Sequence, residues 1–273
     1  MRANEDQVTA MGLIRNLCQL GAALAVAATV VPAAAQDAQP QPACSAPSEL
    51  TRVDYALSRT MKRLAVAQPI KIVAIGSSST AGAGASSQAM SYPSRLEAEL
   101  KSLFPRVPFT VINRGIGGET SREMIARFDA DVIAERPDVV VWQLGSNSVL
   151  REQPIRPASA FIRQGLVKLK TTGSDVILMN PQYAPKVIAK PNIDQMVDLI
   201  AAIAKEANVN LFQRFAVMRY WRLTEDIPFS TFLSPDELHL NDWSYGCIAK
   251  MLAGAIEEAA TRSTVTAGAT PPR

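Results

Sequence analysis

Histidine is the scarcest chemically active residue in this chain, because the 273 residues include only one, His239. An enzyme that uses imidazole as its general base therefore has a single candidate here. Cysteine is also scarce, and none of the three cysteines stands beside the histidine. We accordingly expect neither a thiol nucleophile nor a zinc site.

The charge balance and the hydrophobic runs exclude two further classes. The net charge is only +3, which does not favour a nucleic-acid partner. The long apolar run, residues 17–31, is too short and too rich in alanine to span a bilayer comfortably. We therefore expect no nucleic-acid partner and no stable membrane insertion of the mature chain. An apolar content of 48% is still ample for a sizeable core.

That apolar run is part of a pattern typical of a secretory signal. A short segment with one basic residue begins at Met11, the run follows, and Ala33-Ala34-Ala35 supplies the small residues of a cleavage site. We expect residues 1–35 to be a signal peptide, with Met11 as an alternative start, and the protein to be periplasmic or secreted; a retained membrane anchor is the alternative. A flexible tether (36–48), the folded domain (49–263) and a disordered tail (264–273) are expected to follow.

Cleavage would leave two cysteines, Cys44 in the tether and Cys247 after the histidine. An even pair in an oxidising compartment is compatible with a disulfide between the N-terminal segment and the last helix. The sequence does not supply the Cα separation that a bridge requires, so the pairing stays open at this point.

Five short β-rich runs alternate with helical periodicities along the rest of the chain. We expect strands at residues 70–75, 109–112, 138–144, 175–179 and 210–215. We expect helices at residues 49–66, 92–103, 121–135, 157–171, 191–207 and 242–261. Strands separated by helices indicate a parallel sheet. The sequence thus predicts a single three-layer αβα domain that binds ligands at the carboxyl ends of its strands.

The polar residues suited to catalysis follow these strands. Ser78 comes after the first strand, Gly118 after the second and Asn147 after the third. Asp236 and His239 come after the fifth, just beyond a loop expected at residues 219–235. A serine hydroxyl is a poor nucleophile without a base, and an aspartate beside a histidine can orient the imidazole. This combination predicts acyl transfer.

Four sequence blocks resemble, in order, those of the SGNH, or GDSL, hydrolase family. They are Gly76-Ser77-Ser78, Asn113-Arg114-Gly115-Ile116-Gly117-Gly118, Gly145-Ser146-Asn147 and Asp236-Glu237-Leu238-His239. The resemblance spans nearly the whole mature domain and implies a flavodoxin-like five-stranded sheet and a serine esterase without a metal or other cofactor.

By position in these blocks, Ser78 matches the family's nucleophile, His239 its base and Asp236 the carboxylate that orients the base. The resemblance also implies an oxyanion hole formed by the backbone N–H groups of Ser78 and Gly118 and the side-chain amide of Asn147.

Two positions depart from the family pattern. Ser77 stands where an aspartate is usual, and Ser148 follows Asn147 where an aspartate is common. The adjacent hydroxyls leave Ser77 and Ser79 open as alternative nucleophiles, ranked below Ser78 on register. Each candidate also has a structural interpretation when taken singly: a polar turn for the serines, a local cap for Asn147, and a helix or turn start for Asp236.

Three more features have two interpretations each. A phosphate cradle at residues 76–84 is disfavoured, because no Gly-Lys-Ser/Thr follows and the glycine spacing misses the dinucleotide fingerprint. The small residues 81–87 are instead expected to form a mobile loop over the site. Aromatic residues near the Asp-His pair and after the fourth strand fit either a substrate platform or simple packing; they are Tyr183 (with Lys186 close by), Tyr220, Trp221, Phe229 and Phe232.

The substrate is the least determined part of the interpretation. An exported enzyme meets envelope sugars and environmental esters, so our leading expectation is a short acyl group, such as O-acetyl, on a carbohydrate or envelope glycan. A lipase or thioesterase for longer acyl chains comes next. A periplasmic O-acetyltransferase and a non-catalytic envelope-binding module are also compatible with these motifs. The sequence does not determine the oligomeric state.

Overall fold

A parallel sheet of five strands runs through the computed structural model, which describes residues 41–262. The strands are β1 (Ile70–Gly76), β2 (Phe109–Gly115), β3 (Val139–Gln143), β4 (Asp175–Met179) and β5 (Asn210–Phe212). Their order across the sheet is β2-β1-β3-β4-β5. All neighbours pair in parallel, and the register aligns Gly76 with Gly115. This is the flavodoxin-like arrangement, so the predicted fold class is confirmed.

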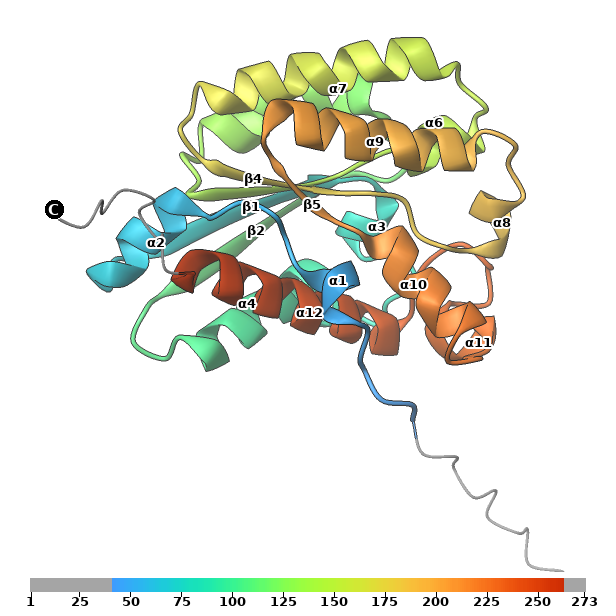
Figure 1. Ribbon diagram of the computed structural model, residues 1–273, viewed down its shortest axis with the longest axis horizontal. Helices are drawn as coiled ribbons and strands as arrows, with labels where there is room; N and C mark the ends of the chain where they lie inside the picture. The colour runs from blue at the N-terminus through green and yellow to red at the C-terminus, as the bar shows by residue number, and fades with distance from the viewer. Residues whose placement is uncertain (1–40, 263–273) are drawn as a thin grey trace, which may run out of the picture. The chain divides into compact units, whose positions relative to one another are not determined.

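Helices cover both faces of this sheet (Figure 1). One layer consists of α4 (Tyr92–Leu103) and α12 (Asp242–Thr261), with α2 (Ser58–Ala65) beside α12. The other layer consists of α5 (Ser121–Ala126), α7 (Ile155–Lys170) and α9 (Ile193–Ala207). Because both faces are covered, the central strand β3 is wholly buried, which explains its continuous apolar run.

Short helical segments fill the connections between these elements. They are α1 (Ser48–Thr51), α3 (Ser78–Ala81), η1 (Gln88–Met90), the π-helical turn η2 (Asp129–Ile133), α6 (Ser146–Leu150), α8 (Pro185–Ile188), α10 (Arg214–Leu223) and α11 (Phe229–Phe232). Between residues 41 and 262, none of the helices is long and apolar enough to cross a membrane.

The single helix predicted at residues 49–66 is wrong, because the chain forms α1 and α2 with a non-helical segment between them. Tyr55, in that segment, donates its N–H to Asn210 Oδ1 (2.7 Å) and accepts from Asn210 Nδ2 (2.9 Å) at the start of β5. The apolar residues that suggested one helix are nevertheless buried in part, as Val53 and Leu57 show. Tertiary hydrogen bonds to the sheet edge therefore replace the helical ones.

Other boundaries also differ from the prediction. The helix expected at residues 121–135 is divided into α5 and η2. The strand expected at residues 210–215 stops at Phe212, because α10 begins at Arg214. The expected loop at 219–235 accordingly contains the end of α10 and all of α11.

The described part of the expected tether is attached to the domain at two points. Cys44 and Cys247 form a disulfide with a Cα separation of 5.3 Å, which confirms that pairing. Beside it, Trp221 Nε1 donates to the Ser45 carbonyl (2.9 Å). The polar composition of this segment does not prevent anchoring, because a covalent bond and a side-chain donor supply it. The predicted signal peptide (1–35), the first tether residues (36–40) and the predicted tail (264–273) lie outside the described residues.

Candidate active site

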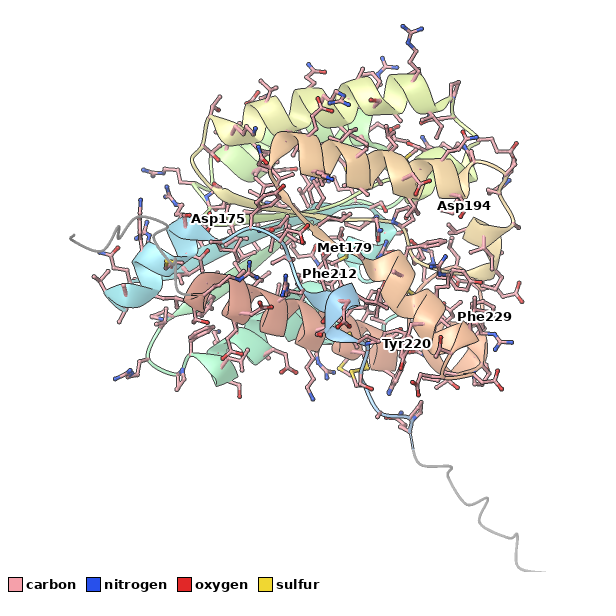
Figure 2. All side chains as sticks on the ribbon, in the orientation of Figure 1. Asp175, Met179, Asp194, Phe212, Tyr220 and Phe229 are labelled. Carbon is pink, nitrogen blue, oxygen red and sulfur yellow. A yellow bond between two sulfur atoms is a disulfide. The ribbon has the colours of Figure 1, made fainter. Side chains whose placement is uncertain are left out.

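The candidate residues gather at the carboxyl ends of the strands. Figure 2 shows which end of the sheet this is: Asp175 marks the end at which β4 begins, and Phe229 lies toward the opposite end, where the strands finish. At that end β1 finishes at Gly76 and α3 begins at Ser78, so the first candidate serine starts a helical turn directly after a buried strand.

Three adjacent serines have different environments in this turn. Ser77 is 2% exposed, and both its N–H and its hydroxyl donate to Gln143 Oε1 at the end of β3 (2.9 and 3.1 Å). Ser79 is 1% exposed. Ser78 is more accessible, and its Oγ lies 2.8 Å from His239 Nε2. The geometry therefore favours Ser78 over its two neighbours as the hydroxyl available to a base.

Asp236 makes both the turn-closing contacts and the contact with the imidazole, which the sequence left as alternatives. Its Oδ1 accepts from the backbone N–H groups of Leu238 (3.0 Å) and His239 (2.9 Å) and from the Ser234 hydroxyl (2.7 Å). Its Oδ2 lies 2.5 Å from His239 Nδ1. One carboxylate oxygen thus closes the turn, and the other orients the imidazole.

These contacts also determine the charge state of the carboxylate. Partial burial by itself would raise the pKa of Asp236. The hydrogen bonds from His239, Ser234 and Leu238 outweigh burial and hold that pKa well below its ordinary value. Asp236 is therefore an anion throughout the neutral and mildly acidic range.

The predicted oxyanion residues other than Ser78 belong to the turns that follow β2 and β3. Asn147, on α6, donates one amide hydrogen from Nδ2 to the Glu119 carbonyl (2.8 Å), which leaves the second hydrogen available to a substrate. Gly118 has φ +82°, a conformation that disfavours any residue with a side chain. Its carbonyl accepts from Arg151 Nη2 (2.7 Å). The side chains of Asn147 and Arg151 together hold the Gly118-Glu119 segment.

A partly buried arginine that lies outside the predicted site ties this segment to the nucleophile turn. Arg127 Nε donates to Glu119 Oε2 (2.8 Å), and its Nη2 donates to the carbonyls of Arg114 (2.8 Å) and Gly76 (3.4 Å). Because one guanidinium contacts the ends of β1 and β2 and the Gly118 segment, it restrains all three. In the sequence, Arg127 lies in the middle of a predicted helix, and nothing in that pattern indicates that it connects these segments.

The segment expected to be a mobile loop, residues 81–87, is bonded to the start of α12. The N–H and hydroxyl of Ser86 donate to Asp242 (2.8 and 2.6 Å), and the Tyr245 hydroxyl donates to the Ala83 carbonyl (2.7 Å). Gly84 packs closely on residues 234–240, which we call the histidine segment. An added Cβ at Gly84 would lie 2.9 Å from His239 Cβ and 2.4 Å from the Leu240 oxygen. The small size of residue 84 thus allows the close approach of His239 and Leu240.

The aromatic residues divide between packing and the surface of a groove. Trp221 and Phe232 are buried and pack on each other, which supports the packing interpretation for them. Phe229 stacks on Tyr183 (centroids 6.0 Å apart) and lines a groove of about 540 Å³ beside the histidine segment. The remaining lining residues of this groove are Gly84, Ser230, Leu233, Ser234, Pro235, Glu237 and Asn241.

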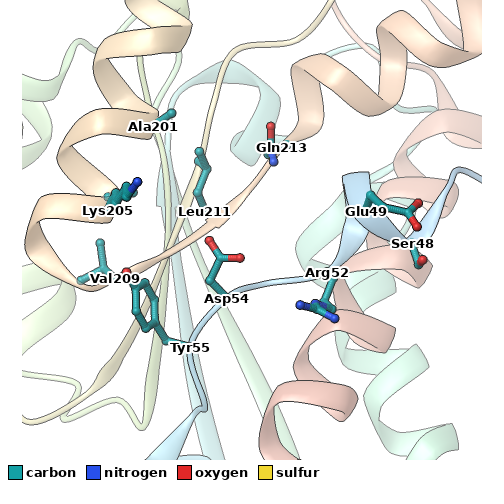
Figure 3. A pocket seen from close by; sticks show the side chains of 11 residues that line it. Ser48, Glu49, Arg52, Asp54, Tyr55, Ala201, Lys205, Val209, Leu211 and Gln213 are labelled. Carbon is teal, nitrogen blue, oxygen red and sulfur yellow. The ribbon is translucent and has the colours of Figure 1, made fainter.

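A second hollow, of about 690 Å³, lies at the edge of β5 (Figure 3). Ala201 and Lys205 of α9 line it on the left of this view, and Glu49 and Arg52 line it on the right. It contains none of the predicted site residues, so size alone does not identify the candidate site.

A family model described as the non-GDSL lipase-like family matches residues 43–262. The chain belongs to this family. Membership in the non-GDSL lipase-like family, which is of SGNH type, confirms the resemblance seen in the four sequence blocks. The description also agrees with Gly76-Ser77-Ser78, in which the aspartate of the GDSL motif is absent.

Two curated proteins are similar to this member of the non-GDSL lipase-like family. An acetylxylan esterase of Geobacillus stearothermophilus is 30% identical over 122 residues, or 40% of this chain and 56% of that protein. An arylesterase of Vibrio mimicus is 28% identical over 151 residues, or 53% of this chain and 70% of that protein. The match to the first relative thus spans about half of its length.

Two solved esterase structures share this fold. A two-domain esterase active on acetylated mannans superposes with a TM-score of 0.69 at 22% identity, covering 82% of this chain and 59% of that one. An acetylxylan esterase from Geobacillus stearothermophilus superposes with a TM-score of 0.57 at 23% identity, covering 68% and 94%. At these identities the likeness supports the fold.

Proposed function

We propose that the protein is a serine esterase in which Ser78 is the nucleophile, His239 the general base and Asp236 the residue that orients the base. The observation that carries this proposal is the continuous series of contacts from Asp236 Oδ2 to His239 Nδ1 and from His239 Nε2 to Ser78 Oγ (2.5 and 2.8 Å). The arrangement has the order of groups that activates a serine hydroxyl.

In the proposed reaction, Ser78 Oγ attacks the ester carbonyl while its proton passes to His239 Nε2. The ionised Asp236 stabilises the imidazolium that forms. The oxyanion of the tetrahedral intermediate accepts from the N–H groups of Ser78 and Gly118 and from the second amide hydrogen of Asn147. His239 then returns the proton to the leaving alcohol. Water, deprotonated by His239, attacks the acyl-enzyme in the same way, which releases the acid and returns the proton to Ser78 Oγ.

We propose a short acyl group, such as acetyl, on a carbohydrate as the substrate. Two features support this choice. The acetylxylan esterase relative has an activity of that kind by its name. The groove that Phe229 lines beside the histidine segment offers an aromatic face with polar neighbours, which suits a sugar ring.

The export proposed from the N-terminal sequence is supported by the Cys44–Cys247 disulfide, a bond typical of oxidising compartments.

The proposal is tested by offering the purified protein acetylated xylo- and manno-oligosaccharides and p-nitrophenyl esters of increasing chain length. We expect acetate release from the oligosaccharides and a steep loss of rate beyond short acyl chains, both abolished by Ser78→Ala. Preference for long-chain esters would contradict the substrate. Transfer of the acyl group to an added sugar in place of hydrolysis would make the protein an acetyltransferase.

A further inference from the structure

A buried arginine lies behind the candidate site without a carboxylate partner among residues 41–262. Arg214, the first residue of α10, is 1% exposed. Its Nε donates to the Asn180 carbonyl (3.1 Å), and its Nη2 donates to Gln182 Oε1 (3.0 Å). Removing a charge from water is costly, and buried arginines are ordinarily paired with acids. Here the neutral side chain of Gln182 takes that place.

Gln182 makes three hydrogen bonds from a position that is 2% exposed. Its Oε1 accepts from Arg214 and from the Ser146 hydroxyl (2.7 Å), and its Nε2 donates to the Leu238 carbonyl (3.2 Å). A guanidinium can only donate and a carbonyl can only accept. The two partners therefore fix which end of the amide faces each of them.

The residues that Gln182 contacts are neighbours of the residues proposed to react. Ser146 directly precedes Asn147, the proposed side-chain donor to the oxyanion, and Leu238 directly precedes His239. Within the histidine segment, the N–H groups of Leu238 and His239 donate to Asp236 Oδ1. Gln182 restrains the same segment from outside, at a carbonyl that those bonds do not use.

We propose that Gln182, oriented by Arg214, is a positioning residue that sets His239 relative to Asn147. This inference rests on the proposed esterase function. It explains why an amide accompanies the buried guanidinium: a glutamate would pair with Arg214 and still accept from Ser146, but it would place an oxygen against the Leu238 oxygen. The histidine segment would then move, and a displacement of about 1 Å in a reacting group can lower a rate by about 100-fold.

The test compares Gln182→Glu with wild type and with a matched control. Gln68→Glu is suitable, since the exposed Gln68 also accepts from an arginine, Arg63 (3.0 Å), and lies before β1 at the opposite end of the sheet. For Gln182→Glu we expect kcat on p-nitrophenyl acetate to fall about 10- to 100-fold with little change in KM. We expect its Tm to equal or exceed that of wild type, because the new carboxylate pairs with Arg214. Gln68→Glu should keep wild-type kcat.

Wild-type kcat in a folded Gln182→Glu protein would overturn the inference, and so would a loss of kcat that only follows a fall in Tm. If that variant does not fold, Arg214→Lys is the second test, because it keeps the charge but loses the fork that orients the amide. A lowered kcat at unchanged Tm supports the inference, and wild-type kcat overturns it. Failure of the wild-type protein to hydrolyse any ester would instead overturn the proposed function and this inference with it.

Discussion

Replacing Asp236 by asparagine should leave the turn intact and remove only the orientation of the base. In the wild-type protein three donors converge on Oδ1, from Ser234, Leu238 and His239. In Asp236→Asn the amide oxygen must stay at that position, because an NH₂ group there would face three donors. The NH₂ group consequently replaces Oδ2 and faces His239 Nδ1.

The expected size of the effect follows from that geometry. With a donor opposite Nδ1, the neutral imidazole must carry its proton on Nε2. A protonated Nε2 cannot accept the proton of the Ser78 hydroxyl. Serine enzymes with the wrong histidine tautomer lose about 10⁴-fold in kcat, which corresponds to about 5.4 kcal/mol of transition-state stabilisation. The turn keeps its acceptor, so Tm should be close to that of wild type.

The assay is the initial rate of p-nitrophenyl acetate hydrolysis together with a thermal melt followed by circular dichroism. Asp236→Ala is the control, since it removes both oxygens and should lower kcat and also destabilise the protein by about 1–2 kcal/mol. A folded Asp236→Asn protein whose kcat stays within about tenfold of wild type would refute the claim that Asp236 orients the base.

Three further outcomes are expected. Asn147→Ala should lower kcat by about 100- to 1000-fold with a small change in KM, measured by steady-state kinetics, because it removes an oxyanion donor; an equal loss expressed in KM would indicate ground-state binding instead. Cys44→Ser with Cys247→Ser should lower the free energy of unfolding by about 2–5 kcal/mol in urea titrations, because the bridge closes a loop with a sequence separation of 203 residues; unchanged stability would show that the bridge does not form. Folding lowers the pKa of Asp236, so the stability that this carboxylate contributes is present above the ordinary aspartate pKa of about 3.9 and is lost as the pH falls below it. The difference in unfolding free energy between wild type and Asp236→Ala should therefore shrink between about pH 5 and pH 2. A constant difference would contradict the claim that folding lowers the pKa of Asp236.

The sheet was predictable because each strand carries its own signal. The run at residues 70–75 is apolar, rich in β-branched residues and ended by a glycine, and it forms β1. Residues 49–66 show where such signals fail. Their helical periodicity is real in that Val53 and Leu57 are both buried, but the bonds of Tyr55 to Asn210 depend on a residue 155 positions away. The periodicity of residues 49–66 cannot predict a contact with a residue so distant in the sequence.

The candidate site divides in the same way. Ser78 stands in a short motif at the end of β1, Asp236 and His239 stand in another just before α12, and the structure brings them together. Gln182 and Arg214 belong to no motif, because their importance depends on burial and on partners from separate elements. The one local sign of such a position is a polar residue shortly after a buried strand, as Gln182 is after β4.

The central claim, an activated Ser78, is tested most directly by the mass of the intact protein after incubation with a fluorophosphonate, with peptide mapping of the adduct. The account predicts one adduct, on Ser78, that forms in wild type and fails to form in His239→Ala. Folded wild-type protein that acquires no adduct, or acquires it on Ser77 or Ser79, would contradict the account.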